Sequence, residues 1–327
     1  MAYCMKLHED ISLFSDIIRR AAEHPMEGGL GIRAQFIEKD YWITNALRNL
    51  AESSFSDIAV FKGGTSLSKA HGIGYRFSED IDIAIMTHGN ISDSGLNSTI
   101  RSVEKSMAQD MVEIEHPQTS KGSRYRKSFY QYPQQFSSIP NSVISGHLLL
   151  EINSFANPFP YGKMLIRSFV ADYLLKVMRR DLIEELSLKP FEINVLDKRT
   201  TMIEKLISIM RFSLADNPVG ELNARIRHFY DLHFLYEDND CKEFLESSNF
   251  KNTFIELLGH DRVMFDNPKG WNRKSIDVSP LITDFHGFWN KLKRRYETEL
   301  PPLAYSLTVP SSDKIEKSIS EIIKFLI

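Results

Sequence analysis

Apolar residues recur along much of this 327-residue chain with the spacing of amphipathic helices. Residues 6–24 show the pattern first, with Leu7, Ile11, Phe14 and Ile18 on one predicted face. Further helices are predicted over residues 34–51, 66–70, 98–111, 169–185, 200–212, 224–236 and 312–327. Helices therefore dominate the second half of the chain.

Shorter apolar runs predict strands in the first half. Residues 58–61 form an apolar run that ends at two glycines, and isoleucine occupies every second position from Ile81 to Ile85. Residues 143–153 predict a third strand, and residues 191–196 are read as a strand or a loop. This order predicts an α+β fold, with one domain over residues 1–160 and a mainly helical domain over residues 161–327.

Charge and cysteine usage exclude several classes of protein. The net charge is −3, with 40 basic and 43 acidic residues, so the overall charge does not indicate nucleic-acid binding. A local basic groove is still compatible with this balance. Cys4 and Cys241 fit neither a disulfide framework nor a zinc site. No apolar run of about 18 residues and no secretory signal pattern is found, so we expect a cytoplasmic protein.

The stretch Gly63-Gly64-Thr65-Ser66 follows the first predicted strand. Two glycines let the backbone turn sharply and approach a ligand closely. A helix that begins at Ser66 would offer free N–H groups to a phosphate, and the hydroxyl of Thr65 or Ser66 would add a donor. The stretch lacks the pattern of a Walker A loop, and a pair of glycines is often only a turn.

Asp80 and Asp82 lie two positions apart on the second predicted strand, so both carboxylates point to the same face. Adjacent carboxylates repel each other unless a cation lies between them, and magnesium prefers such oxygen ligands. A solvated edge strand would explain an isolated pair. The nearby glycine turn favours a metal site that holds nucleotide phosphates.

Glu151 borders the apolar residues 148–150 of the third predicted strand. A charged residue at this place needs either a partner or an exposed strand end. If its strand lies beside that of Asp80 and Asp82, Glu151 completes a two-magnesium site, which activates a hydroxyl and stabilises leaving pyrophosphate. An exposed strand end fits the sequence equally well.

Taken in order, these motifs resemble the AbiEii/AbiGii toxin family of nucleotidyltransferases. The resemblance covers roughly residues 36 to 236. It rests on the glycine turn, Arg76-x-Ser78-x-Asp80-x-Asp82, Glu38-Lys39-Asp40-Tyr41-Trp42, Glu204-Lys205-Leu206 and Arg227-His-Phe-Tyr-Asp231-Leu232. Relatives often carry Asp where this chain has His228, which leaves the role of Arg227 open.

The resemblance implies a polymerase-β-like nucleotidyltransferase core with a helical C-terminal domain. It also implies the toxin of a bacterial type IV toxin–antitoxin or abortive-infection pair, with a cognate antitoxin encoded nearby. Some relatives transfer nucleotides from a nucleoside triphosphate to tRNA 3′ ends. The resemblance implies that Asp80 and Asp82 bind magnesium, with Glu151 a less secure third ligand. It implies that the nucleotide is bound by Gly63, Gly64, Thr65, Ser66, Arg76 and Lys205. It implies catalytic roles for Asp80, Asp82, Ser78, Lys205 and Asp231.

Basic and aromatic residues interleave between residues 121 and 132. We expect this stretch to bind the acceptor, because lysine and arginine meet phosphates and tyrosine stacks on unpaired bases. An ordinary, partly exposed loop is the alternative. A second basic cluster, residues 291–295, is read as a solvated helix face or a contact with a tRNA backbone.

Three functional hypotheses follow. The first is a magnesium-dependent nucleotidyltransferase toxin that modifies an RNA acceptor such as the tRNA 3′ end. The second keeps the reaction but places the nucleotide on a hydroxyl of a protein or a small molecule. The third is a catalytically silent protein that binds nucleotide or RNA; the joint presence of Asp80, Asp82, Lys205 and Asp231 argues against it.

Overall fold

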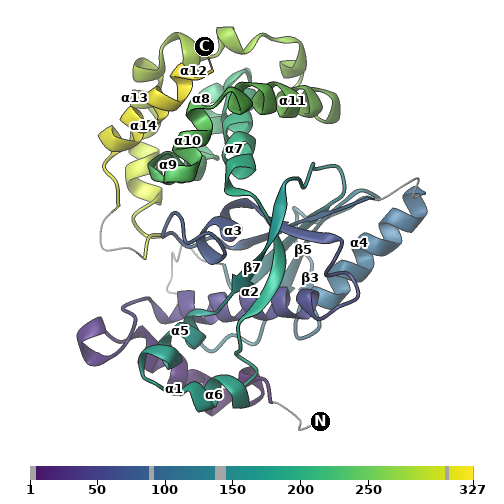
Figure 1. Ribbon diagram of the computed structural model, residues 1–327, viewed down its shortest axis with the longest axis vertical. Coiled ribbons are helices and arrows are strands. Elements are labelled where there is room, and N and C mark those ends of the chain that lie inside the picture. The colour runs from purple at the N-terminus through teal and green to yellow at the C-terminus, as the bar shows by residue number, and fades with distance from the viewer. Residues whose placement is uncertain (1–4, 88–91, 137–144, 306–308, 327) are drawn as a thin grey trace. The chain divides into compact units, whose positions relative to one another are not determined.

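The computed structural model describes residues 5–87, 92–136, 145–305 and 309–326. The chain divides into two compact units (Figure 1). The first contains the residues up to Ala70 and Phe77–Leu196, and the second contains His71–Arg76 and the residues from Asp197 onward. Each unit is described by itself. In the described part of the chain, no helix has both the length and the apolar character needed to cross a membrane.

A mixed sheet organises the first unit. Its strand order is β3-β5-β6-β2-β1-β8-β7, and β4 also pairs with β5. β2 runs parallel to β6, and β8 runs parallel to β1, whereas the other pairs are antiparallel. The strands are β1 (Ala59–Lys62), β2 (Asp80–Ile85), β3 (Val112–Ile114), β4 (Ser120–Lys121), β5 (Tyr125–Gln131), β6 (His147–Asn153), β7 (Tyr161–Ile166) and β8 (Phe191–Leu196).

Helices cover one face of this sheet. α2 packs against β6 and β8, and α4 packs against α2, β5 and β6 (Figure 1). The alternation of side chains in β2 explains which face they cover, because Ile81 and Ile83 are fully buried while Asp80 and Asp82 are only half-buried. The helices of the first unit are α1 (Ile11–Ala22), α2 (Ala34–Ala51), α3 (Gly63–Lys69), α4 (Asp93–Met107), α5 (Phe169–Lys176) and α6 (Arg180–Glu185).

The described part of the second unit is helical. α9 contacts α7, α10, α13 and α14, and the rings of Phe229 and Trp289 lie 5.4 Å apart in its core. The segment His71–Arg76 joins this unit through Tyr75, whose carbonyl accepts the N–H of Tyr305 at 3.0 Å. The helices of the second unit are α7 (Lys198–Ser213), α8 (Pro218–Asn223), α9 (Ile226–Glu237), α10 (Asn239–Glu246), α11 (Ser248–Met264), α12 (Pro280–Thr283), α13 (Phe285–Glu299) and α14 (Ser312–Lys324).

The structure confirms the α+β fold class and places the division of the chain later than residue 160. β8 pairs with β1 through Phe61 and Val195, and β7 pairs with β8 over its whole length. Residues 161–196 therefore complete the sheet of the first unit, and the units separate after Leu196. Pairing between strands so distant in sequence leaves no local signal, which is why helical periodicity alone placed the boundary too early.

Two predicted elements differ from the structure. The helix expected over residues 169–185 is interrupted between α5 and α6, where Met178 has a φ of 58°. The basic and aromatic stretch, for which a partly exposed loop was the alternative reading, is mostly strand β5. Residues 143 and 144 of the third predicted strand lie outside the described residues, and β6 begins at His147.

Candidate active site

The turn after β1 brings Gly63 against the carboxylate of Asp82. Gly63 has a φ of 78°, which a residue with a side chain rarely adopts, and a Cβ atom at this position would overlap Oδ2 of Asp82. α3 begins at Gly63 itself, three residues earlier than the sequence predicts. Glycine is therefore required here both for the turn and for the approach of Asp82.

The hydroxyl groups of the turn hold its conformation. Thr65 donates a hydrogen bond to the backbone carbonyl of Asp80, and Ser66 donates one to the carbonyl of Gly63 at 2.9 Å. Both residues are buried, with Ser66 0% exposed. Gly64 lies in the first turn of α3, and Ser78 is half-buried two residues before β2. The hydroxyl bonds thus tie the glycine turn to the start of the strand that carries Asp80 and Asp82.

Charged residues form a row across four neighbouring strands. Lys127 on β5 lies opposite Glu151 on β6, and Glu151 lies opposite Asp82 on β2. Asp82 in turn lies opposite Lys62 on β1. Residues that face each other across strands project to the same side of a sheet, so two acids lie between two bases. The sequence places Lys62 beside the glycine turn, but only the strand register reveals it as the neighbour of Asp82.

Glu151 is engaged by two side chains of β5. Its carboxylate forms an ion pair with Lys127 at 2.8 Å and a hydrogen bond with Tyr125. Burial raises the pKa of Tyr125, and the negative charges of Glu151, Asp82 and Asp80 raise it further. Tyr125 therefore stays protonated and donates a hydrogen bond to the Glu151 carboxylate.

The carboxylates can be tested against the needs of magnesium. Asp80 and Asp82 supply hard oxygen ligands on one face of β2, which suits an ion that keeps positions open for water and phosphate oxygens. Glu151 would have to leave Lys127 before it could join them. Within the described ranges, no group of three or more His, Cys, Asp or Glu residues is arranged to hold a metal ion. Within this region, the aspartate pair is the set of side chains that would hold magnesium.

Buried charges on α2 support both ends of this region. The ammonium group of Lys39 lies 3.1 Å from Oε1 of Glu79, the residue before Asp80. Asp40 accepts a hydrogen bond at 2.7 Å from Lys69, the last residue of α3. Lys39 and Asp40 are almost completely buried, so both pairs are shielded from water. The resemblance had marked residues 38–42 as a motif without giving them a role, and the structure shows that they anchor the turn and β2.

A second charged group lies in the other unit. Arg76 binds Asp231 with two parallel hydrogen bonds, Nε to Oδ1 at 2.7 Å and Nη2 to Oδ2 at 2.6 Å, and Lys205 lies 2.8 Å from Oδ2. All three residues are buried. Burial alone would raise the pKa of Asp231, but the charges of Arg76 and Lys205 outweigh it and hold that pKa well below its usual range. Two cations on one anion leave a net positive charge.

This arrangement bears on the roles that the resemblance implies. A carboxylate with a strongly lowered pKa is a poor base, so the geometry favours Asp231 as the residue that orients Lys205 and Arg76. Burial lowers the pKa of His228, and the charge of Lys205 lowers it further, so His228 is neutral. Arg227 pairs with Glu299 at 3.2 Å instead of joining the group.

The basic and aromatic stretch, expected to bind the acceptor, is neither free for that role nor the partly exposed loop of the alternative reading. Phe129, Tyr130 and Tyr132 are buried in the core, and Arg126 forms a buried pair with Glu104 at 2.6 Å. The other bases are paired as well, Lys121 with Glu113, Arg124 with Asp93 and Lys127 with Glu151. In residues 291–295, Lys293 pairs with Asp313 and Arg295 with Glu299. The partners of Arg124, Arg126 and Lys127 lie on elements distant in the sequence, which hid their pairing, whereas Glu299 follows Arg295 by one helical turn.

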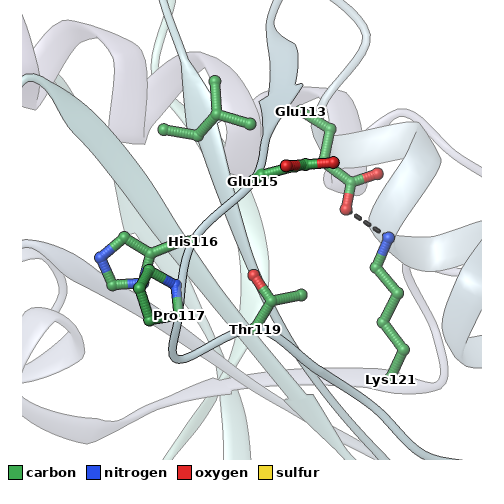
Figure 2. Close-up of a pocket in the computed structure, with 7 residues that line it drawn as sticks. Glu113, Glu115, His116, Pro117, Thr119 and Lys121 are labelled. Carbon is green, nitrogen blue, oxygen red and sulfur yellow. Dashed lines mark ion pairs between the residues drawn. The ribbon is translucent and has the colours of Figure 1, made fainter.

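A pocket of the first unit lies beside β3 and β4 (Figure 2). Its lining includes Glu113, Glu115, His116 and Lys121, and Lys121 forms its ion pair with Glu113 there. None of the candidate site residues lines it.

The structure gathers most of the predicted site residues into two groups. One group contains Gly63, Thr65, Ser66, Asp80, Asp82 and Glu151, and the other contains Arg76, Lys205 and Asp231.

Three comparisons relate the chain to known proteins, and the match to a family model agrees with the motifs. A nucleotidyltransferase from H. pylori of known structure is 16% identical, with 90% of this chain and 97% of that chain covered and a TM-score of 0.44. MenT4, a nucleotidyltransferase toxin from Mycobacterium tuberculosis, is 13% identical, with 95% and 98% covered and a TM-score of 0.47. No curated protein sequence matches the chain. The family model of the nucleotidyl transferase AbiEii toxin, type IV toxin–antitoxin system, matches residues 45–315, so the chain belongs to this family of nucleotidyltransferase toxins.

Proposed function

We propose that this toxin transfers a nucleotide from a nucleoside triphosphate to an RNA acceptor, such as a tRNA 3′ end, and depends on magnesium. The family supplies the reaction class and implies a cognate antitoxin. The observation that carries the magnesium proposal is the pair Asp80 and Asp82, held on one face of β2 beside a turn that only glycine can make. Metal-dependent nucleotide transfer needs such paired oxygen ligands next to a close backbone approach.

The reaction balances without a further co-reactant. The oxygen of the acceptor hydroxyl forms a bond to the α-phosphorus, and the bond from that phosphorus to the bridging oxygen breaks. Pyrophosphate leaves with the electron pair, and the hydroxyl proton passes to solvent or to a carboxylate of the site. Magnesium bound at Asp80 and Asp82 would neutralise phosphate oxygens and make the hydroxyl easier to deprotonate.

The residues of the chain contribute position and charge. The Gly63 turn leaves the backbone free to approach the nucleotide, while Thr65 and Ser66 fix that turn. Lys205 and Arg76 offer their excess positive charge to the triphosphate, and Asp231 keeps both side chains oriented. Glu151 joins the aspartates as a third ligand only if Lys127 releases it.

Two other functional hypotheses predict a different outcome of the labelling reaction. The same site would also place a nucleotide on a hydroxyl of a protein or a small molecule, and a silent member of the family would bind nucleotide or RNA without reacting. Purified protein is therefore incubated with magnesium, each α-labelled nucleoside triphosphate and either total RNA or total protein. Label in RNA supports the proposal, and label only in protein or in small molecules contradicts the RNA acceptor.

The variant Asp80→Ala controls this experiment. It removes one of the two proposed ligands, so we expect labelling to disappear while the thermal unfolding profile shows a folded protein. Labelling by Asp80→Ala at the rate of the unchanged protein would refute the metal site. Absence of label on every acceptor, with folded protein and magnesium present, would refute the enzymatic readings under those conditions.

A further inference from the structure

Three exposed side chains lie at every second position from just before the start of the edge strand β7. The exposed fractions are 48% for Phe159 and 38% for Tyr161, and Lys163 is exposed as well. Their spacing of two residues places Tyr161 and Lys163 on the same face of the sheet. The rings of Phe159 and Tyr161 lie 5.5 Å apart, so the aromatic side chains are contiguous. We call Phe159, Tyr161 and Lys163 the β7 stripe.

The strand register places Tyr161 and Lys163 of the β7 stripe on the face that carries the aspartate pair. Asp82 lies opposite Lys62, and Leu196 lies opposite Tyr161. Phe61 is opposite Val195, so the following residues, Lys62 and Leu196, are neighbours on the other face. Tyr161 therefore continues the row of Asp82 across the same sheet. Three strand spacings separate them, a distance of about 14 Å.

The charge of the β7 stripe is available to a partner. No ion pair of Lys163 occurs within residues 5–87, 92–136, 145–305 and 309–326, whereas each base of residues 121–127 is paired with an acid. The stripe is bounded at its far end, because Leu165 lies opposite the exposed Glu192, whose charge repels phosphate. Two adjacent exposed aromatic rings, tilted by 51° to each other, beside a lysine without an ion pair in the described ranges match the chemistry of single-stranded nucleic acid.

We propose that the β7 stripe holds the unpaired end of the acceptor RNA, with Phe159 and Tyr161 stacked on bases and Lys163 on a phosphate. This inference rests on the proposed RNA acceptor and gives it a location. Unpaired bases present their faces to aromatic side chains, and Tyr161 lies on the sheet face that carries Asp82. The buried aromatic residues of β5 cannot play this part.

The test compares variants of the β7 stripe in RNA binding and in nucleotide transfer. We measure the fluorescence anisotropy of a labelled single-stranded RNA oligonucleotide and of a blunt RNA duplex, and the KM values for RNA and for nucleoside triphosphate. The variants are Phe159→Ala/Tyr161→Ala and Lys163→Met. The matched controls are Met178→Ala, an exposed apolar residue of the same unit, and Lys105→Met, an exposed lysine on α4.

The double variant should lose roughly tenfold or more in affinity for single-stranded RNA, because stacking contributes strongly to such binding. Lys163→Met should lower the slope of log affinity against log salt by about 0.7. Duplex binding, the KM for triphosphate and the two controls should stay unchanged.

Each contrary result has a separate meaning. If the unaltered protein labels no RNA, the proposed function fails, and this inference fails with it. If it labels RNA and the double variant binds the single strand equally well, only the β7 stripe is refuted. Unchanged RNA binding together with lost self-association in sedimentation would also refute it, because the stripe would then be a protein interface.

Discussion

At the residue scale, Gly63 carries two constraints at one position. Its φ of 78° excludes most side chains, and an added Cβ atom would displace the carboxylate of Asp82. We expect Gly63→Ala to lower the rate of nucleotide transfer by at least roughly tenfold, because a displacement of about 1 Å at a reacting group has effects of this size. Gly28→Ala is the matched control, since Gly28 has a φ of 97° but open space around it. Full activity of Gly63→Ala would contradict the account.

Glu38 provides a residue-scale test of the supporting structure. Its carboxylate accepts the N–H groups of Gln135 at 2.6 Å and Phe136 at 3.2 Å. Burial raises the pKa of Glu38 to about 7, although these hydrogen bonds oppose the rise. A raised pKa means that the folded protein binds the proton more tightly than the unfolded chain. Its contribution to stability is therefore present below pH 4.5 and is lost as the pH rises toward 7.

Glu38→Gln should remove this pH dependence. Relative to the variant, the unaltered protein should lose stability between pH 4.5 and 7, by roughly 3 kcal/mol at most. Above pH 7 the difference in stability between the two proteins should stay constant. Thermal unfolding across that range measures the difference, with Glu52→Gln at the exposed end of α2 as the control. Parallel profiles for the unaltered protein and Glu38→Gln would show that Glu38 does not titrate in this range.

At the scale of elements, β5 is joined to α4 by the buried pair of Arg126 and Glu104. Removal of one partner leaves a buried charge, so Arg126→Met should cost about 3–5 kcal/mol of unfolding free energy. Arg126→Met/Glu104→Met should regain most of this loss because both charges are gone. Arg124→Met, which breaks an exposed pair with Asp93, should cost less than about 1 kcal/mol. Denaturant unfolding that shows no recovery in the double variant would contradict a buried pair.

The elements that periodicity predicts well are those with one clearly buried face. α2 covers the predicted residues 34–51, and the isoleucines of β2 alternate as expected. β5 was misread because the acid that pairs with Arg126 lies on another element. β7 was missed because its outward residues are exposed and its inner ones give no apolar alternation. Such features depend on tertiary partners, which the local sequence does not contain.

At the scale of the molecule, one short motif is shared between the two units. Arg76 belongs to the second unit and pairs with Asp231, whereas Ser78, Asp80 and Asp82 belong to the first. The sequence shows the motif as continuous, and its order identified the family that the comparison confirms. The pairing of Glu151 with Lys127 and of Arg76 with Asp231 required the structure, because these partners are distant in the chain.

The central claim is that Asp80 and Asp82 support magnesium-dependent transfer of a nucleotide. The most direct measurement compares RNA labelling from α-labelled and γ-labelled nucleoside triphosphate by the unaltered protein, Asp82→Asn and Asp57→Asn, with and without magnesium. Asp57 is an exposed aspartate of the same unit and serves as the control. We predict that only the α-label enters RNA, that it requires magnesium, and that Asp82→Asn loses at least roughly a hundredfold in rate while Asp57→Asn does not. Undiminished labelling by Asp82→Asn, or labelling after removal of all divalent metal, would contradict the claim.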